Sequence, residues 1–298
     1  MRTVTVGGVM AANLIRFAAL VGIVLLMFSE GLHIERGELR FVLRRPGLAA
    51  RSVLASVVLV PAAAWVCAVV FRPPAPVQVG LAILAASPLC PFVFEKIARA
   101  EGDRVFARSL HVVLAIVAIV STPLALAGLG RSLALPLHFP VFRTAIQVLL
   151  TVLAPILAGV VTYRFSPKRA ARVREPLEKV ALGAIVLAFV PVLTLRIRVF
   201  TELGPGGYLA FVGMVILSLA IGHTLAGRDE RRRTTLALES AARNPGLALA
   251  IAAVDFPGAH PAAVLLPWLA VFVLVTGLYG AVRRRTTTSA RALRPPAR

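Results

Sequence analysis

Nine blocks of mostly apolar residues make up most of the 298-residue chain, and they constrain its fold more than any other feature. An α-helix needs about 20 apolar residues to cross the hydrocarbon core of a bilayer. With polar and proline-rich stretches taken as breaks, the predicted segments are 9–32, 48–71, 76–101, 104–127, 141–163, 176–200, 206–226, 231–254 and 261–282. We therefore predict an all-α polytopic membrane protein with nine transmembrane helices.

The composition excludes an ordinary soluble protein. Hydrophobic residues make up 58% of the chain and charged residues only 15%, too little polar surface for a soluble domain of this length. A net charge of +20 in a soluble protein would suggest a nucleic-acid partner. Here the basic residues lie in short runs between apolar blocks, as in the cytoplasmic loops of membrane proteins. The expected partner is the lipid bilayer and not nucleic acid.

The distribution of Lys and Arg predicts the orientation of the chain. The segments 33–51, 96–108, 164–179, 228–233 and 283–298 hold 25 basic residues, and the other connections hold 6. Cytoplasmic loops carry the excess of positive charge, so the first set is predicted to be cytoplasmic. The N-terminus is then outside, and the basic tail 283–298 lies in the cytoplasm against anionic headgroups. We expect a multi-pass protein of the inner (plasma) membrane.

Two of the nine segments are interrupted near their middle. Pro88 and Pro91 interrupt the third segment, and Pro245 and Gly246 interrupt the eighth. Proline removes a backbone donor and clashes with the preceding turn, so each helix should break there. One break lies early and one late, and because the two segments stand an odd number of positions apart in the order of spans, they can insert in opposite directions. This pattern predicts inverted repeats whose broken helices cross near the membrane midplane.

Charged side chains lie beside the later break. Glu239 and Arg243 are four residues apart, so they share one helix face, and Asn244 follows directly. A charge at this depth costs at least a few kcal/mol and is tolerated where protein or a watery cavity surrounds it. We predict that Glu239, Arg243 and Asn244 line a water-filled binding site. The alternative is an internal ion pair that locks the helix bundle.

Two further polar residues are candidates for the same site. Glu95 follows the earlier break and would bind an ion or substrate if its side chain points inward, whereas Lys96 can extend to the cytoplasmic face. His111 lies within the fourth segment and titrates near neutral pH when unperturbed, which makes it a candidate switch. A histidine that only packs between helices is the alternative.

Several stretches resemble the bile acid:sodium symporter family, whose members carry bile acids and other organic anions. The stretches are MFSEGL at 27–32, LRRPG at 43–47, VPAAAW at 60–65, RRRTTLALESAARNPGLALAIAA at 231–253 and PWLAVFVLVTGLYGAV at 267–282. The chain is similar to the nine-span members that lack the first helix of the ten-span form.

The resemblance implies a transporter of two parts that rock against each other. A panel would consist of about 9–32 and 141–200, and a core of about 48–127 and 206–282. A small organic anion would bind in the crevice between them, near the crossing of the third and eighth segments. The substrate's identity and the oligomeric state are left open.

The chain departs from the family at positions that bind sodium. Where sodium-coupled members have Glu followed four and five residues later by Gln and Asn, this chain has Glu239, Arg243 and Asn244. A family Ser-Asn pair falls on Val93 and Phe94, and a family Gln falls on Ser56. Any bound sodium would therefore rely on Glu239 and Asn244, although hard cations prefer several oxygen ligands.

These departures predict that Arg243 stands in for sodium. Its fixed charge would hold Glu239 ionised and add positive potential for an anionic substrate. Coupling would then come from protons, through Glu95, Glu239 or His111, or would be absent. We expect no other cofactor.

Two other functions, an exporter and a sensor, are also compatible with the sequence. An exporter similar to the arsenite exporters would use Cys90 in the early broken segment, and a transporter-like sensor would explain the loss of sodium ligands. An enzyme is not expected, because the spans contain no paired aspartates, serine-lysine dyad or histidine-rich cluster.

Overall fold

A computed structural model describes residues 6–35, 37–135, 140–195, 198–255 and 261–292. The described residues form helices joined by short connections, with no strand among them. Five helices are long and apolar enough to span a membrane: Pro46–Phe71, Arg104–Ser132, Val141–Phe165, Gly204–Leu225 and Val264–Thr286. Shorter apolar helices lie at Leu20–Leu32 and Ala75–Ala85. An all-α polytopic membrane protein is confirmed, while the count of nine crossings stays a prediction.

Each of the nine predicted segments coincides with one helix or with consecutive helices. In chain order the helices are α1 (Val6–Leu32), α2 (Leu39–Leu43), α3 (Pro46–Val53), η1 (Leu54–Leu59), α4 (Val60–Phe71), α5 (Ala75–Ala85), α6 (Val93–Arg99), α7 (Arg104–Ser132), α8 (Val141–Val148), η2 (Leu149–Leu153), α9 (Ala154–Phe165), α10 (Pro167–Leu195), α11 (Val199–Glu202), α12 (Gly204–Leu225), α13 (Glu230–Ala241), α14 (Pro245–Asp255) and α15 (Pro261–Ala292).

Two long helices are widened locally at a proline. The π-helical turns η1 and η2 come directly before Pro61 in α4 and Pro155 in α9. A proline lacks the amide that would bond to the preceding turn, and a wider turn accommodates its ring. Both helices continue past the proline, so each pair still forms a single long rod.

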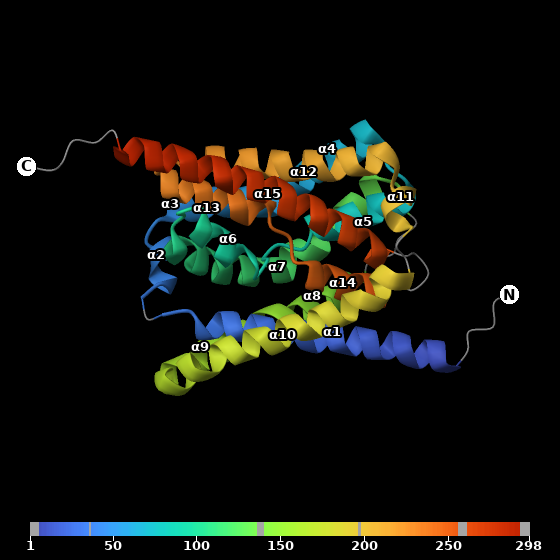
Figure 1. The fold of residues 1–298 in the computed structure, drawn as a ribbon, viewed down its shortest axis with the longest axis horizontal. Coiled ribbons are helices and arrows are strands. Elements are labelled where there is room, and N and C mark those ends of the chain that lie inside the picture. Colours follow the sequence, from blue (N-terminus) through green and yellow to red (C-terminus); the bar gives the residue numbers. More distant parts are fainter. Residues whose placement is uncertain (1–5, 36, 136–139, 196–197, 256–260, 293–298) are drawn as a thin grey trace, which may run out of the picture.

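The helices fall into two layers. Helix α1 packs against α9 and α10 in one layer, drawn along the lower side of Figure 1, with α3, α4, α12, α13 and α15 on the upper side. The shorter α5, α6 and α14 lie between these two sides, together with α7. Helices α1 and α9 approach closely because Gly31 and Gly159 face each other, where any Cβ would meet backbone of the other helix. Assignment of these layers to a panel and a core stays a prediction.

The basic connections gather at one end of the bundle. Helix α2, the α9–α10 turn, the start of α13 and the end of α15 all lie at the left in Figure 1, whereas α1 begins at the right. Large apolar side chains are exposed on the outer faces of most long helices, as with Val70, Leu124, Leu187 and Leu274. Such faces suit contact with lipid tails. The side of the membrane that the basic end faces stays a prediction.

Candidate functional site

Both predicted helix breaks are present, and they touch. Helix α5 ends at Ala85 and α6 begins at Val93, so Pro88 and Pro91 lie in the intervening loop. The backbone amide of Asn244, in the gap between α13 and α14, donates a hydrogen bond of 2.9 Å to the carbonyl oxygen of Ser87. We call this meeting of the two gaps the crossing. The hydrogen bond between Asn244 and Ser87 joins two residues that lie more than half the length of the chain apart in the sequence.

The later break lies slightly earlier than the sequence predicted. The gap covers residues 242–244, and Pro245 and Gly246 are the first residues of α14 instead of part of the gap. Proline suits the first helical position, where its missing amide would have no partner anyway. Gly246 is required for space, because a Cβ there would lie 2.3 Å from Cγ1 of Ile23 in α1. The lack of a side chain at Gly246 therefore allows α1 to pack closely against the break.

Asn244 caps the half-helix α14. Its Oδ1 accepts hydrogen bonds from the amides of Gly246, at 3.1 Å, and Leu247, at 3.0 Å. These amides lie in the first turn and have no partner within the helix, so the cap stabilises its start. The buried Nδ2 of the same side chain has no hydrogen-bond partner among the residues that the structure describes. One polar atom of Asn244 therefore stays available for a ligand.

Arg243 binds backbone carbonyls and not Glu239. Its Nη1 donates to the carbonyl oxygens of Ser56, at 3.2 Å, and Ala85, at 3.4 Å, and its Nη2 donates to that of Ser240. The guanidinium thus stabilises the C-terminal end of α5, where partial negative charge collects. Among the described residues no ion pair joins Arg243 to Glu239, so the alternative of a pair that locks the bundle does not describe this conformation.

Glu239 lies beside His111 at the crossing. Glu239 is 1% exposed, and its Oε2 lies 3.8 Å from Nδ1 of His111, which is 2% exposed. Neither carboxylate oxygen and neither ring nitrogen has a hydrogen-bond partner in the described part of the chain. The His111 ring packs on Phe94, with 4.9 Å between the ring centroids. His111 therefore packs against the ring of Phe94 and also lies beside the carboxylate of Glu239.

Several buried polar atoms at the crossing lack partners. Ser56 Oγ, Ser240 Oγ and Arg243 Nε join those of Glu239, His111 and Asn244 in this group. Buried polar groups are nearly always hydrogen-bonded, and a cluster without partners indicates a place for a ligand, an ion, a proton or water. The prediction that Glu239 and Arg243 line a water-filled crevice does not describe this conformation, because protein encloses both side chains.

Glu95 lies apart from this buried cluster. Its side chain is 72% exposed and forms an ion pair with Arg99, one helical turn further along α6. The helical spacing of these two residues brings them together on the outer face. The side chain of Glu95 nevertheless lines one of two cavities that lie between the two layers.

Two cavities lie between the layers beside the crossing. We call the first the apolar cavity; it measures about 320 Å³ and is lined by Phe92, Lys96, Leu182, Ile185, Val186, Val190, Pro245, Leu266, Leu269, Phe272 and Val273. The second, the acidic cavity, measures about 340 Å³ and is lined by Leu26, Glu30, Pro91, Phe92, Phe94, Glu95, Glu178, Lys179 and Leu182. Phe92 and Leu182 line both, so the cavities adjoin. Each has the volume of a small-molecule site.

The acidic cavity contains residues that the sequence analysis missed. Glu30 and Glu178 come from α1 and α10, and neither was a candidate. A signal was present, because Glu30 is a charged residue inside the first apolar block. The position of Glu178 depends on how α10 packs on α1, which sequence spacing does not reveal.

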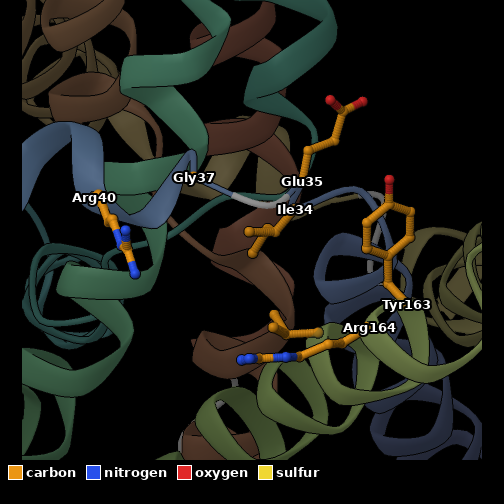
Figure 2. A pocket seen from close by; sticks show the side chains of 7 residues that line it. Ile34, Glu35, Gly37, Arg40, Tyr163 and Arg164 are labelled. Carbon is orange, nitrogen blue, oxygen red and sulfur yellow. The ribbon is translucent and has the colours of Figure 1, made fainter.

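A third cavity lies away from the crossing, at the basic end. It measures about 490 Å³ and is formed by the connection between α1 and α2, by α2 and by α9 (Figure 2). Arg40, Arg164 and Glu35 contribute charge of both signs. We assign no substrate role to this surface cavity.

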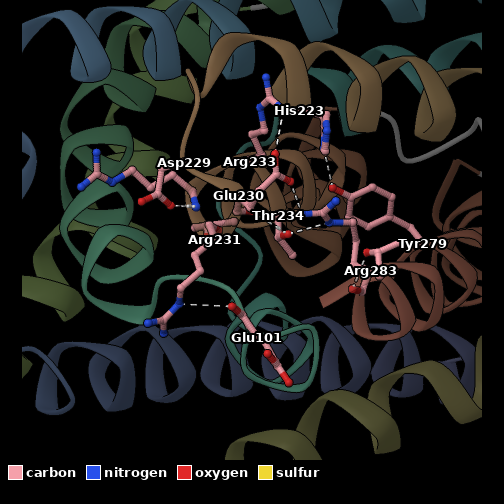
Figure 3. Close-up of polar contacts among 12 residues, drawn as sticks. Glu101, His223, Asp229, Glu230, Arg231, Arg233, Thr234, Tyr279 and Arg283 are labelled. Atoms are coloured by element: carbon pink, nitrogen blue, oxygen red, sulfur yellow. Dashed lines mark hydrogen bonds and ion pairs between the residues drawn. The ribbon is translucent and has the colours of Figure 1, made fainter. Parts of the chain in front are cut away.

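A polar network holds the outer end of α13. Glu230 binds Arg233 and Arg283, the Arg283 Nε donates to Thr234 Oγ1, and His223 bonds to the Tyr279 hydroxyl (Figure 3). These residues join α13 to α12 and α15. The first half of the broken helix is thus fixed at its outer end.

Comparisons with known proteins agree with this architecture. Residues 20–222 match the model of the sodium bile acid symporter family. A protein of Bacillus subtilis (strain 168) named "Uncharacterized sodium-dependent transporter YocS" is 26% identical over 255 residues, which cover 82% of this chain and 77% of that protein. The family match covers more than half of the chain, including the early break and both layers. The chain belongs to the sodium bile acid symporter family.

Proposed function

We propose that the protein is a secondary transporter that binds a small organic anion between its two layers and moves it by alternating access. Family membership and the named transporter relative support membrane transport. One observation carries the site: the two breaks meet at the Asn244–Ser87 hydrogen bond, among buried polar atoms without partners and beside two cavities. Broken helices that meet inside a bundle are how many transporters bind substrate.

The proposed motion is a rocking of one layer against the other. The panel would contain α1, α9 and α10, and the core would contain the two broken segments. Ile23 of α1 packs directly on Gly246, so the panel covers the start of α14 in this conformation. Movement of α1 away from Gly246 would open the crossing to a ligand. We propose that the substrate crosses chemically unchanged, and hence that the protein is not an enzyme.

Positive charge at the crossing would attract the anionic group of the substrate. Arg243 supplies a permanent charge, and the start of α14 supplies a positive dipole end. Asn244 Nδ2 and Ser56 Oγ are polar atoms without partners that a carboxylate or sulfonate could use. These groups are the substrate contacts that we propose.

We propose further that transport does not require sodium. The guanidinium of Arg243 would repel a cation at this position, and Val93 and Phe94 offer no side-chain oxygen. A proton shared by Glu239 and His111 is the alternative coupling ion, because the two side chains are 3.8 Å apart and otherwise unpartnered. Glu95 suits this role less well, since it is exposed and paired with Arg99.

The test is uptake of labelled small carboxylates and sulfonates into proteoliposomes. Flux is measured in sodium, potassium and choline buffers, at mildly acidic and mildly alkaline pH. We expect pH-dependent flux in all three salts; Glu239→Gln should abolish this flux, whereas Glu230→Gln at the outer end should leave it unchanged. A strict sodium requirement would contradict the coupling proposal while leaving transport intact. Absence of flux for every probe would contradict the transporter proposal itself.

A further inference from the structure

The acidic cavity contains a buried carboxylate without a partner. Glu30 is only 7% exposed and lines the cavity, and it forms no hydrogen bond or ion pair within the described residues. The neighbouring Ser29 bonds across to the carbonyl oxygen of Arg174, which fixes this part of α1 against α10. A buried carboxylate is costly unless a cation or hydrogen-bond donors surround it. A charged Glu30 therefore needs a partner from outside the chain.

The charges around Glu30 do not supply that partner. Glu178, Arg108 and Glu239 are the side chains whose charges act on it most. Two of these are carboxylates that repel it. The third, Arg108, already forms an ion pair of 3.0 Å with Glu38. Two carboxylates that repel Glu30, and an arginine already paired elsewhere, leave Glu30 without a cation partner of its own among the described residues.

The cavity walls match the chemistry of an ammonium group. Glu30, Glu95 and Glu178 contribute three carboxylates, of which Glu95 is paired with Arg99, and Lys179 contributes one ammonium. Phe92 and Phe94 contribute aromatic rings to the same cavity. Carboxylates beside aromatic rings form the usual protein environment for an organic cation. An anion alone would be repelled from this cavity, although the family carries anions.

We propose that the acidic cavity is a subsite for the ammonium group of a zwitterionic substrate, an amino-carboxylate or aminosulfonate. The inference rests on the proposed transport function and narrows its substrate class. The ammonium group contacts Glu30 between α1 and α10, and the anionic group points toward the crossing, where Lys96 and Arg243 supply positive charge.

The experiment compares acids that differ only by one amino group. Binding to the purified full-length protein is measured by calorimetry and thermal shift for β-alanine against propionate, and for γ-aminobutyrate against butyrate. We expect the amino acid of at least one pair to bind about tenfold more tightly, the size of one buried charged contact. Glu30→Gln should abolish this preference, and Glu30→Asp should retain part of it.

Matched controls separate the inference from folding and from free cations. Glu35→Gln removes an exposed carboxylate near the same end of α1 and should leave the preference intact. Sodium chloride and methylammonium are tested alone. If sodium alone stabilises the wild type and not Glu30→Gln, the cavity binds a free ion and the zwitterion proposal is wrong.

Two other results would also overturn the inference. Tighter binding of the plain acids than of the amino acids would refute it while leaving the anion-transport proposal standing. Equal preference in wild type and Glu30→Gln would show that Glu30 is a protonated packing group, because glutamine mimics that state. Absence of binding and of flux for both classes of probe would reject the inference and the transport function together.

Discussion

The two ends of α13 differ in how completely their polar groups are satisfied. At the outer end, Glu230 has two arginine partners and Thr234 accepts from Arg283. At the inner end, Glu239 is more deeply buried, yet neither of its oxygens has a hydrogen-bond partner within the described part of the chain. The outer end of α13 is thus fixed by ion pairs, whereas the inner end has carboxylate oxygens that accept no hydrogen bond from the described residues. Charge at the outer end serves structure, whereas charge at the inner end is the group that we propose to act in ligand or proton binding.

Replacement of Arg243 should have the largest effect of any single change at the crossing. Arg243→Gln leaves carbonyl oxygens of Ser56, Ala85 and Ser240 without a charged donor. We expect a loss of about 3 kcal/mol or more in stability, and loss of flux. Thermal unfolding in detergent and proteoliposome uptake measure the two effects. A variant of wild-type stability would mean that these carbonyls find other donors, and Arg243→Lys tests whether charge alone restores the fold.

Glu239→Gln should separate function from stability. The wild-type carboxylate is buried without a partner, so an uncharged amide removes a cost of burial instead of a favourable contact. We expect a thermal midpoint at or above that of the wild type together with loss of uptake. A clear drop in stability with normal uptake would reverse the contrast between the two ends of α13.

Gly246→Ala should test how closely α1 must approach the break. The added Cβ would lie 2.3 Å from Cγ1 of Ile23, so α1 has to shift or Ile23 has to change rotamer. Overpacking of this kind costs about 1–3 kcal/mol and should reduce uptake. The double variant with Ile23→Ala should recover both properties. Gly277→Ala in α15, where a Cβ meets nothing within 4 Å, is the matched control and should be neutral or stabilising.

Glu230→Gln should have the smallest effect. The side chain is 56% exposed, and exposed ion pairs contribute less than about 1 kcal/mol. The bond to Arg283 lowers the pKa of Glu230 below its ordinary value of 4.5. Its stabilisation is therefore complete above that value and is lost as pH falls through the lowered pKa. Wild type should melt slightly above the variant at neutral pH and equal to it in strong acid, with unchanged uptake at neutral pH.

Local signals in the sequence predicted the segments and their breaks. Apolar block length gives the helices, and Pro88, Pro91 and Pro245 interrupt a helix wherever it packs. The sequence Asn-Pro-Gly even carries a cap signal for α14, since Asn favours the N-cap and Pro the first turn. These features depend on neighbours in the chain, and for that reason they can be predicted without a structure.

Side-chain partners across the bundle could not be predicted in this way. The spacing of Glu239 and Arg243 indicates a shared face, but the reach of Arg243 to Ser56 and Ala85 depends on helices far away in the sequence. The same limit applies to Glu30, whose role depends on α10 and α6 packing around it. Glu95 was predicted as a site residue if its side chain points inward, and the direction of that side chain, which pairs with Arg99 and lines the edge of the acidic cavity, depends on packing that the sequence does not reveal.

The hydrogen bond between Ser87 and Asn244 also constrains biogenesis. The earlier gap is synthesised and inserted long before Asn244 leaves the ribosome, so until then the Ser87 carbonyl lacks its native donor. Because an unpaired carbonyl is costly in lipid, water or another protein must contact the earlier gap until Asn244 is in place. Truncated chains that stop before Asn244 should therefore insert into the membrane but fail to reach the native fold.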